Sequence, residues 1–192
     1  FFFPYIFLLL LFKNENKSKK MNLNIRKAEI SDANLLSVIA SVTFYEAYFD
    51  TDEPDSIARY IVETYNPDQI KSELEDNNST FFIPELESKA VGFAKLRENS
   101  IPECLQGENT IELQRIYLVE RVWRKGFGRI LMEKCLETAK QKGFESLWLG
   151  TWGENVKARK FYEKLGFAKV GEYQYFYGDY LATNFVLKKD LQ

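Results

Sequence analysis

Histidine is absent from this chain of 192 residues, and cysteine occurs only twice, at Cys104 and Cys135. Without histidine, the chain cannot form a serine–histidine or cysteine–histidine catalytic pair, nor the common zinc sites. The two cysteines form no CxxC pair, which favours a reducing, cytoplasmic compartment. We therefore expect no bound metal and no nucleophile of the histidine-activated type.

An excess of charge of one sign is also missing. Lys and Arg number 26 and Asp and Glu number 28, which gives a net charge of −2. Proteins that bind nucleic acid through their phosphates carry a clear basic excess. We therefore expect no nucleic-acid partner.

Long apolar runs are scarce as well. The longest lies at residues 1–12, and it is shorter than the roughly 20 residues that cross a bilayer. Basic residues follow this run, whereas in a secretory signal they precede it. Since Met21 stands directly before the first segment with folded character, we expect residues 1–20 to be a non-native or disordered extension. A membrane tether is the alternative. For residues 21–192 we expect one domain without a membrane association.

Apolar patterning divides the rest of the chain into helices and strands. Helices are predicted at 33–48, 55–65, 67–75, 126–142 and 154–165. Strands are predicted at 23–28, 80–84, 89–96, 110–119, 146–151, 167–177 and 181–187, the last two joined by a turn at Gly178–Asp179. Hairpins alternate with helical crossovers, so we expect an α+β fold with a mixed sheet and helices on both faces.

A basic glycine loop follows the strand predicted at 110–119. It reads Arg124-Lys125-Gly126-Phe127-Gly128-Arg129 and leads into a helix. Glycines let the backbone approach an anion closely, and the free N–H groups at a helix start attract negative charge. The spacing is neither that of a P-loop nor that of a dinucleotide fingerprint. Alone, the loop indicates either a phosphate site or a tight turn.

A second motif lies on the helix predicted at 154–165 and reads N-x-x-A-x-x-F-Y-x-x-x-G-F, from Asn155 to Phe167. Asn155 and Tyr162 are seven residues apart and so lie on one helix face. Glycine loop, strand and this helix together resemble the GCN5-related N-acetyltransferase (GNAT) superfamily over residues 110–167. Glu112–Leu118, Thr43–Tyr45 and residues 178–184 also resemble the bacterial spermidine/spermine N-acetyltransferases.

The resemblance implies a mostly antiparallel, twisted sheet whose central strand pair splays apart to bind acetyl-CoA. Residues that correspond to the family's cofactor-binding positions are Ile116, Tyr117 and Leu118 for the pantetheine arm, Arg124, Lys125, Gly126, Phe127, Gly128 and Arg129 for the pyrophosphate, and Asn155 on the far side. Lys164 could reach the CoA phosphates, although a solvated lysine is the simpler interpretation.

The resemblance also implies direct attack by an amine, with Tyr162 protonating the departing thiolate. Many family members carry a Glu at the place of Gly150, so this chain departs from the pattern. Glu112 is the next candidate for the general base, acting through water. The structural alternatives are a solvated strand carboxylate for Glu112 and a plain core residue for Tyr162. Trp123 is a second departure, since family loops often carry Gln or Arg there.

The expected acceptor is a small primary amine, a polyamine such as spermidine or spermine. Acidic residues after the first helix could attract a cation, or could simply be solvated. They are Glu46, Asp50, Asp52, Glu53 and Asp55, and Tyr45 and Tyr48 could flank an aliphatic chain. A protein N-terminus, a lysine or an aminoglycoside is the alternative acceptor, and a non-catalytic acyl-CoA sensor is the alternative function. A homodimer is possible.

Overall fold

The computed structural model describes residues 22–177 and 180–191, so the predicted extension at 1–20 and the turn at Gly178–Asp179 lie outside the described residues. An eight-stranded sheet has the order β1-β2-β4-β5-β6-β8-β7, with β3 paired to β2. The strands are β1 (Leu23–Lys27), β2 (Ser79–Leu86), β3 (Lys89–Ala90), β4 (Gly92–Arg97), β5 (Thr110–Leu118), β6 (Ser146–Trp152), β7 (Ala168–Tyr177) and β8 (Tyr180–Asp190). Among the strands of the described residues, β5 and β6 are the one parallel pair.

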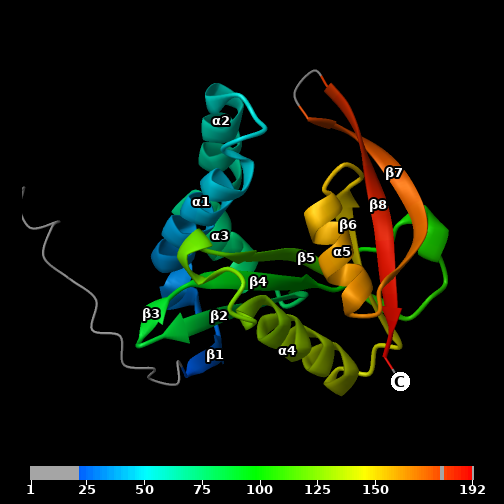
Figure 1. Ribbon diagram of the computed structural model, residues 1–192. Coiled ribbons are helices and arrows are strands. Elements are labelled where there is room, and N and C mark those ends of the chain that lie inside the picture. The colour runs from blue at the N-terminus through cyan, green and yellow to red at the C-terminus, as the bar shows by residue number, and fades with distance from the viewer. Residues whose placement is uncertain (1–21, 178–179, 192) are drawn as a thin grey trace, which may run out of the picture.

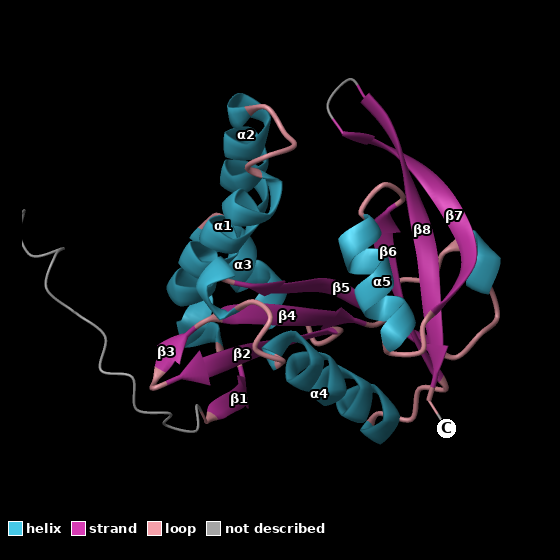
Figure 2. Cartoon of the chain, in the orientation of Figure 1, coloured by secondary structure: helices cyan, strands magenta, loops and turns pink. Residues whose placement is uncertain are grey.

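Helices cover both faces of this sheet, as predicted (Figures 1 and 2). They are α1 (Ala33–Tyr48), α2 (Pro54–Thr64), α3 (Pro67–Glu75), α4 (Phe127–Gln141) and α5 (Val156–Lys164). Helices α1 to α3 share one core cluster with β2 and β4, while α4 shares another with β5 and β6. Cys135 is fully buried in the second cluster, where it packs as a small apolar residue.

Local chemistry explains where the helices begin. Asn66 accepts a hydrogen bond from the Gln69 N–H at 2.9 Å, and Pro67 follows as the first residue of α3. Helix α4 begins at Phe127 because Gly126 has a φ of +83°, a left-handed conformation outside the helix. Helix α5 was predicted to begin at residue 154, but it begins at Val156 because Asn155 is its N-cap.

The strand predicted at 89–96 is divided in the structure. Val91 separates β3 from β4, because the register with β2 shifts by one residue between Ala90, opposite Glu85, and Ala94, opposite Phe82. The hairpin of β2 with β4 is otherwise as expected, with Ser79 opposite Arg97. The closing pair β7–β8 is also confirmed, although β8 runs to Asp190 and is longer than predicted.

The parallel pair β5–β6 is short and then separates. Pairing covers Thr110, Ile111 and Glu112 of β5, and no pairing follows, although both strands continue. Just beyond lies a bulge at Gln114, where the register with β4 shifts. In Figure 1, β6 runs steeply upward, whereas β5 lies nearly horizontal. The splay implied by the resemblance is therefore present.

Candidate active site

The candidate site is built around the separation of β5 and β6. From Leu113 to Leu118, β5 pairs only with β4, so its other edge carries backbone groups without a strand partner. Such an edge can pair with an extended ligand arm. Ile116, Tyr117 and Leu118 lie on this segment, and the Leu118 carbonyl already accepts the Trp123 indole N–H at 2.6 Å. Trp123 thus fastens the glycine loop to the end of β5.

The glycine loop presents its backbone amides outward. Arg124 has a φ of +61° and Gly126 a φ of +83°, so the chain turns sharply before α4. Within the described residues, no acceptor takes the amide N–H groups of residues 124–128. These N–H groups stand at the N-terminus of a helix of 15 residues, where an anion is stabilised. The arrangement fits the pyrophosphate of a nucleotide cofactor.

Side chains of the loop divide into an anchor and free charges. Phe127 is buried in the core cluster of α1 to α3, so only its backbone is available to a ligand. Arg124 and Lys125 are exposed, whereas Arg129 is paired with Glu133 at 2.8 Å on the surface of α4. A Cβ at Gly128 would lie 3.5 Å from Phe161, so the loop also touches α5.

Helix α5 brings the second motif to the same region. Asn155 accepts the Ala158 N–H at 3.0 Å and caps the helix. Phe161 and Tyr162 pack on the core cluster beneath β5 and β6, and the Tyr162 ring lies 5.9 Å from Phe167. Lys164 is exposed at the last turn of the helix. The motif therefore caps helix α5 and packs it on the core, and these structural roles need no ligand.

The hydroxyl of Tyr162 is held in its protonated form. Burial raises the pKa of Tyr162 well above the usual 10, and the nearby Tyr48 and Cys135 add to this effect. Tyr48, on α1, packs on the core cluster of α1 to α3, whereas Tyr162 packs on the cluster of α4, so the two tyrosines approach from opposite faces of the sheet. A neutral phenol at this point can donate a proton to a strong base.

Several more tyrosines gather on the face of the sheet that carries α1 and α2. The Phe44 ring lies 4.5 Å from Tyr48, 4.4 Å from Tyr60 and 6.4 Å from Tyr117. Burial raises the pKa of Tyr175, on β7, to about 12, with a further contribution from Tyr48. Tyrosines from α1, α2, β5 and β7 thus lie close enough to affect one another.

The predicted acidic residues have different surroundings. Asp52 contributes to the raised pKa of both Tyr48 and Tyr175, after the larger effect of burial, so it lies near the tyrosines. Glu46 instead accepts the Glu120 N–H at 2.8 Å and ties α1 to the turn before the glycine loop. The Tyr45 ring packs on Phe49 at 5.6 Å. Asp50, Glu53 and Asp55 are exposed.

Glu112 is buried at the last position of β5 that pairs with β6. Only 6% of its surface is exposed, and it accepts a hydrogen bond from Arg97 Nε at 2.7 Å. Glu112 stands opposite Trp148 of β6, so it lies where the two strands part. The carboxylate is therefore not the solvated strand residue of the structural alternative.

A buried ion network beside the site was not predicted from the sequence. Arg115 donates to both carboxylate oxygens of Glu73, at 2.6 and 3.1 Å, and Lys95 lies 2.8 Å from the same group. Burial alone would raise the pKa of Glu73, but Arg115 and Lys95 outweigh it, and the pKa is lowered. The Arg115 guanidinium also lies 5.2 Å from the Tyr65 ring centre. This network joins α3 to β4 and β5.

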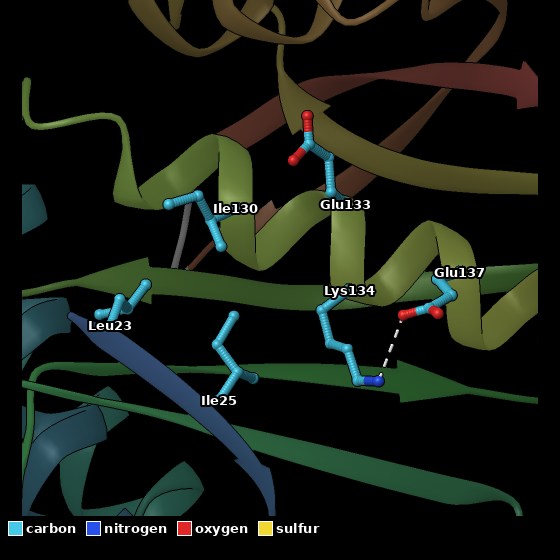
Figure 3. A pocket seen from close by; sticks show the side chains of 6 residues that line it. All are labelled: Leu23, Ile25, Ile130, Glu133, Lys134 and Glu137. Atoms are coloured by element: carbon cyan, nitrogen blue, oxygen red, sulfur yellow. Dashed lines mark hydrogen bonds and ion pairs between the residues drawn. The ribbon is translucent and has the colours of Figure 1, made fainter.

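A separate hollow lies between β1 and α4 (Figure 3). Leu23 and Ile25 of β1 line one side, and Lys134 and Glu137 of α4 form an ion pair of 3.3 Å on the other. None of the predicted site residues lines it. We therefore place the candidate site at the splay and not in this hollow.

Two further properties bear on the class of protein. Across residues 22–177 and 180–191, no three Cys, Asp or Glu side chains come together to hold a metal ion, and the absence of a metal stays a prediction. Every helix in those two ranges falls short of the length and apolar character needed to cross a membrane.

Comparison with known proteins identifies the family. A model of the Acetyltransferase (GNAT) family matches residues 41–167. An uncharacterized N-acetyltransferase from Lactobacillus delbrueckii subsp. lactis is 28% identical over 169 residues, which cover 87% of this chain and 98% of that protein. An N-acetylaspartate synthetase from Xenopus tropicalis is 36% identical over 93 residues, which cover 48% of this chain and 32% of that protein.

Solved structures share the fold. The PaiA N-acetyltransferase from Thermoplasma acidophilum, in complex with coenzyme A, aligns with a TM-score of 0.73 and 24% identity, covering 88% of this chain and 99% of that one. The ribosomal-protein-S18-alanine N-acetyltransferase from Escherichia coli aligns with a TM-score of 0.65 and 18% identity, covering 88% and 94%. With the splayed strands and the free loop amides, these matches show that the chain belongs to the acetyltransferase (GNAT) family and is an acetyl-CoA-dependent N-acetyltransferase.

Proposed function

We propose that this enzyme transfers an acetyl group from acetyl-CoA to a small primary amine, and that polyamines such as spermidine or spermine are its first candidate acceptors. The observation that carries the proposal is the splay of β5 and β6, with the loop amides on one side and the tyrosines on the other. The cofactor and the acceptor can thus approach the same point from two faces of the sheet.

In this proposal acetyl-CoA is held mainly through backbone groups. The free edge of Ile116, Tyr117 and Leu118 pairs with the pantetheine arm, and the amides of residues 124–128 hold the pyrophosphate. Arg124, Lys125, Arg129 and Lys164 add positive charge near the phosphates, and Asn155 closes the far side. Backbone recognition explains why Trp123 can stand where family loops often have Gln or Arg.

The proposed reaction is a direct attack. Glu112 takes a proton from the incoming ammonium, through water, and the free amine nitrogen attacks the thioester carbon. A C–N bond forms and the C–S bond breaks. Tyr162 donates its proton to the departing thiolate. The acetylated nitrogen then loses a proton, which restores the Tyr162 hydroxyl. No covalent acyl-enzyme is needed, in agreement with the absence of histidine from the chain.

Aromatic and acidic groups support a cationic aliphatic acceptor. Tyrosine faces attract ammonium groups, and desolvation strengthens the attraction. Tyr48 and Tyr175 are the candidates for such faces, because Tyr60 stacks on Phe44 and Tyr117 stacks on Phe93. Asp52 adds a carboxylate near Tyr48 and Tyr175. A chain with several amines spaced by methylenes would match both kinds of group.

The test is a panel of acceptors, with release of free CoA as the signal. Spermidine, spermine, putrescine, a lysine peptide, a peptide with a free N-terminus and an aminoglycoside are each offered with acetyl-CoA. We expect the highest kcat/KM for spermidine or spermine. A peptide or the aminoglycoside at the top of the ranking would reject the polyamine assignment, and tight acetyl-CoA binding without release for any amine would indicate a sensor.

The cytoplasmic location and the homodimer stay predictions. Native mass measurement of the purified protein tests the second, since a dimer would double the mass of the 22.5 kDa chain.

A further inference from the structure

The space next to Gly150 is occupied by the hydroxyl of a distant tyrosine. A Cβ atom at position 150 would lie 2.5 Å from Tyr173 Oη and 3.3 Å from Tyr173 Cζ. No side chain can therefore be added there unless the phenol moves. The family resemblance leads one to expect a Glu side chain at this position. In this chain the Tyr173 hydroxyl, from β7, occupies that space instead.

Strand pairing explains how Tyr173 reaches this point. Strand β8 lies between β6 and β7, and its residue Asn184 stands opposite both Trp152 and Tyr173. The Asn184 side-chain Nδ2 donates a hydrogen bond to Tyr173 Oη at 3.0 Å. The phenol is thus fixed at its tip, and its hydroxyl is directed over β8 toward Gly150.

Gly150 faces the side of the sheet on which the acceptor is proposed to bind. Leu147 and Leu149 pack in the core with α4, and alternation along β6 puts Trp148 and Gly150 on the opposite side. Glu112 stands opposite Trp148 in parallel register and shares that side. The Glu112 carboxylate is close enough to add to the raised pKa of Tyr173, for which burial is the larger cause.

The hydrogen-bonding groups of this hydroxyl that Asn184 does not use suit an amine. A phenol oxygen has two lone pairs and one proton. Asn184 uses one lone pair, which leaves one lone pair to accept an N–H and one O–H to donate. Tyr173 is 37% exposed, so a ligand can reach it.

We infer that Tyr173 binds the acceptor: its hydroxyl oxygen accepts a hydrogen bond from the amine nitrogen and holds that nitrogen beside Glu112. This rests on the proposed function and adds a residue to it. Asn184 is the positioning residue, because it acts on the acceptor only through Tyr173. The hydroxyl thus takes over the amine contact that a side chain at Gly150 could have made, while Glu112 keeps the role of base.

The test compares Tyr173→Phe with Glu172→Gln in the acceptor assay. Tyr173→Phe removes only the hydroxyl. Glu172 is the next residue on β7 and is exposed, paired with Lys169 at 2.7 Å, so its variant controls for changes to this strand. We expect kcat/KM for the best amine to fall roughly 10- to 100-fold in Tyr173→Phe, the loss typical of a hydrogen bond to a charged group. The Kd of acetyl-CoA should stay unchanged, and Glu172→Gln should match the wild type.

Gly150→Ala supplies an independent check, because its methyl group pushes against the same hydroxyl. We expect it to lower kcat/KM for the amine, and the double variant with Tyr173→Phe to be no slower than Tyr173→Phe alone. Fully additive losses would overturn the inference, as would a Tyr173→Phe enzyme within twofold of the wild type. If the wild-type enzyme itself acetylates no amine, the proposed function fails instead, and the inference fails with it.

Discussion

The side-chain oxygen of Asn155 accepts the backbone N–H of Ala158 at 3.0 Å, so the residue assigned to the cofactor is also the N-cap of α5. The capping role follows from the geometry, whereas the cofactor role follows from the family pattern. The two roles can be separated, because Asp caps a helix as well as Asn but carries a negative charge.

Asn155→Ala should lower the free energy of unfolding by about 1 kcal/mol, since the Ala158 N–H loses its acceptor. Asn155→Asp should keep the stability of the wild type and bind acetyl-CoA several-fold more weakly. Urea denaturation and calorimetric titration measure the two quantities. Wild-type affinity in Asn155→Asp would restrict Asn155 to its capping role.

Tyr162→Phe tests the proposed general acid. The raised pKa keeps the Tyr162 hydroxyl protonated at neutral pH, so its loss removes the proton donor for the thiolate. We expect kcat to fall roughly 100-fold, the lower range of general acid catalysis. Acetyl-CoA affinity should change little, because the ring remains packed near Phe167. An unchanged kcat would show that Tyr162 is simply part of the core.

Glu73→Gln tests the buried ion network. The substitution leaves Lys95, only 3% exposed, and Arg115 without their carboxylate partner. We expect a loss of about 3 kcal/mol in the free energy of unfolding. Glu133→Gln is the matched control, because its pair with Arg129 is exposed and contributes less than about 1 kcal/mol. Equal, small losses in both variants would mean that the network adds little to stability.

The same network predicts that the free energy of unfolding falls at acid pH. The folded pKa of Glu73 lies below its usual 4.5, so the unfolded chain binds the proton first. The contribution is complete above pH 4.5 and is lost as the pH falls through the lower, folded value. Wild-type stability should therefore drop more steeply in acid than that of Glu73→Gln. Parallel pH profiles for the two proteins would refute this.

Gly128→Trp tests the assignment of the glycine loop. A methyl group fits at this position, since a Cβ would meet Phe161 at 3.5 Å and Leu118 at 3.8 Å, whereas an indole is far larger and would compete with a ligand for the space beside the loop. We expect Gly128→Trp to abolish acetyl-CoA binding and Gly128→Ala to retain most of it. Thermal unfolding of both variants checks that the fold is kept. Binding by the Trp variant would exclude the loop from the cofactor site.

Sequence patterns predicted the parts of the fold that depend on local chemistry. The start of α3 and the end of α1 match the expected bounds, because capping and apolar spacing act over a few residues. The division of the strand predicted at 89–96 was missed, since it depends on the register of this strand against β2, which its own residues do not show.

The site shows the same limit. The loop and the α5 motif could be found because each is continuous in the sequence. Tyr173 could not, because only the pairing of β7 with β8 and of β8 with β6 brings it to Gly150. In the sequence, the one signal that another group occupies this position was the glycine at 150, where the family resemblance leads one to expect a Glu. The network of Glu73, Lys95 and Arg115 also joins three separate elements and has no local pattern.

The most direct test follows the acetyl group itself. Acetyl-CoA labelled in the acetyl carbonyl is incubated with the enzyme and spermidine, and the products are analysed by mass spectrometry and by titration of free thiol. We predict one labelled amide for each CoA released, at a rate that rises with enzyme concentration. Bound acetyl-CoA that stays intact with spermidine and with every other amine of the panel would contradict acetyl transfer to a small amine by this enzyme.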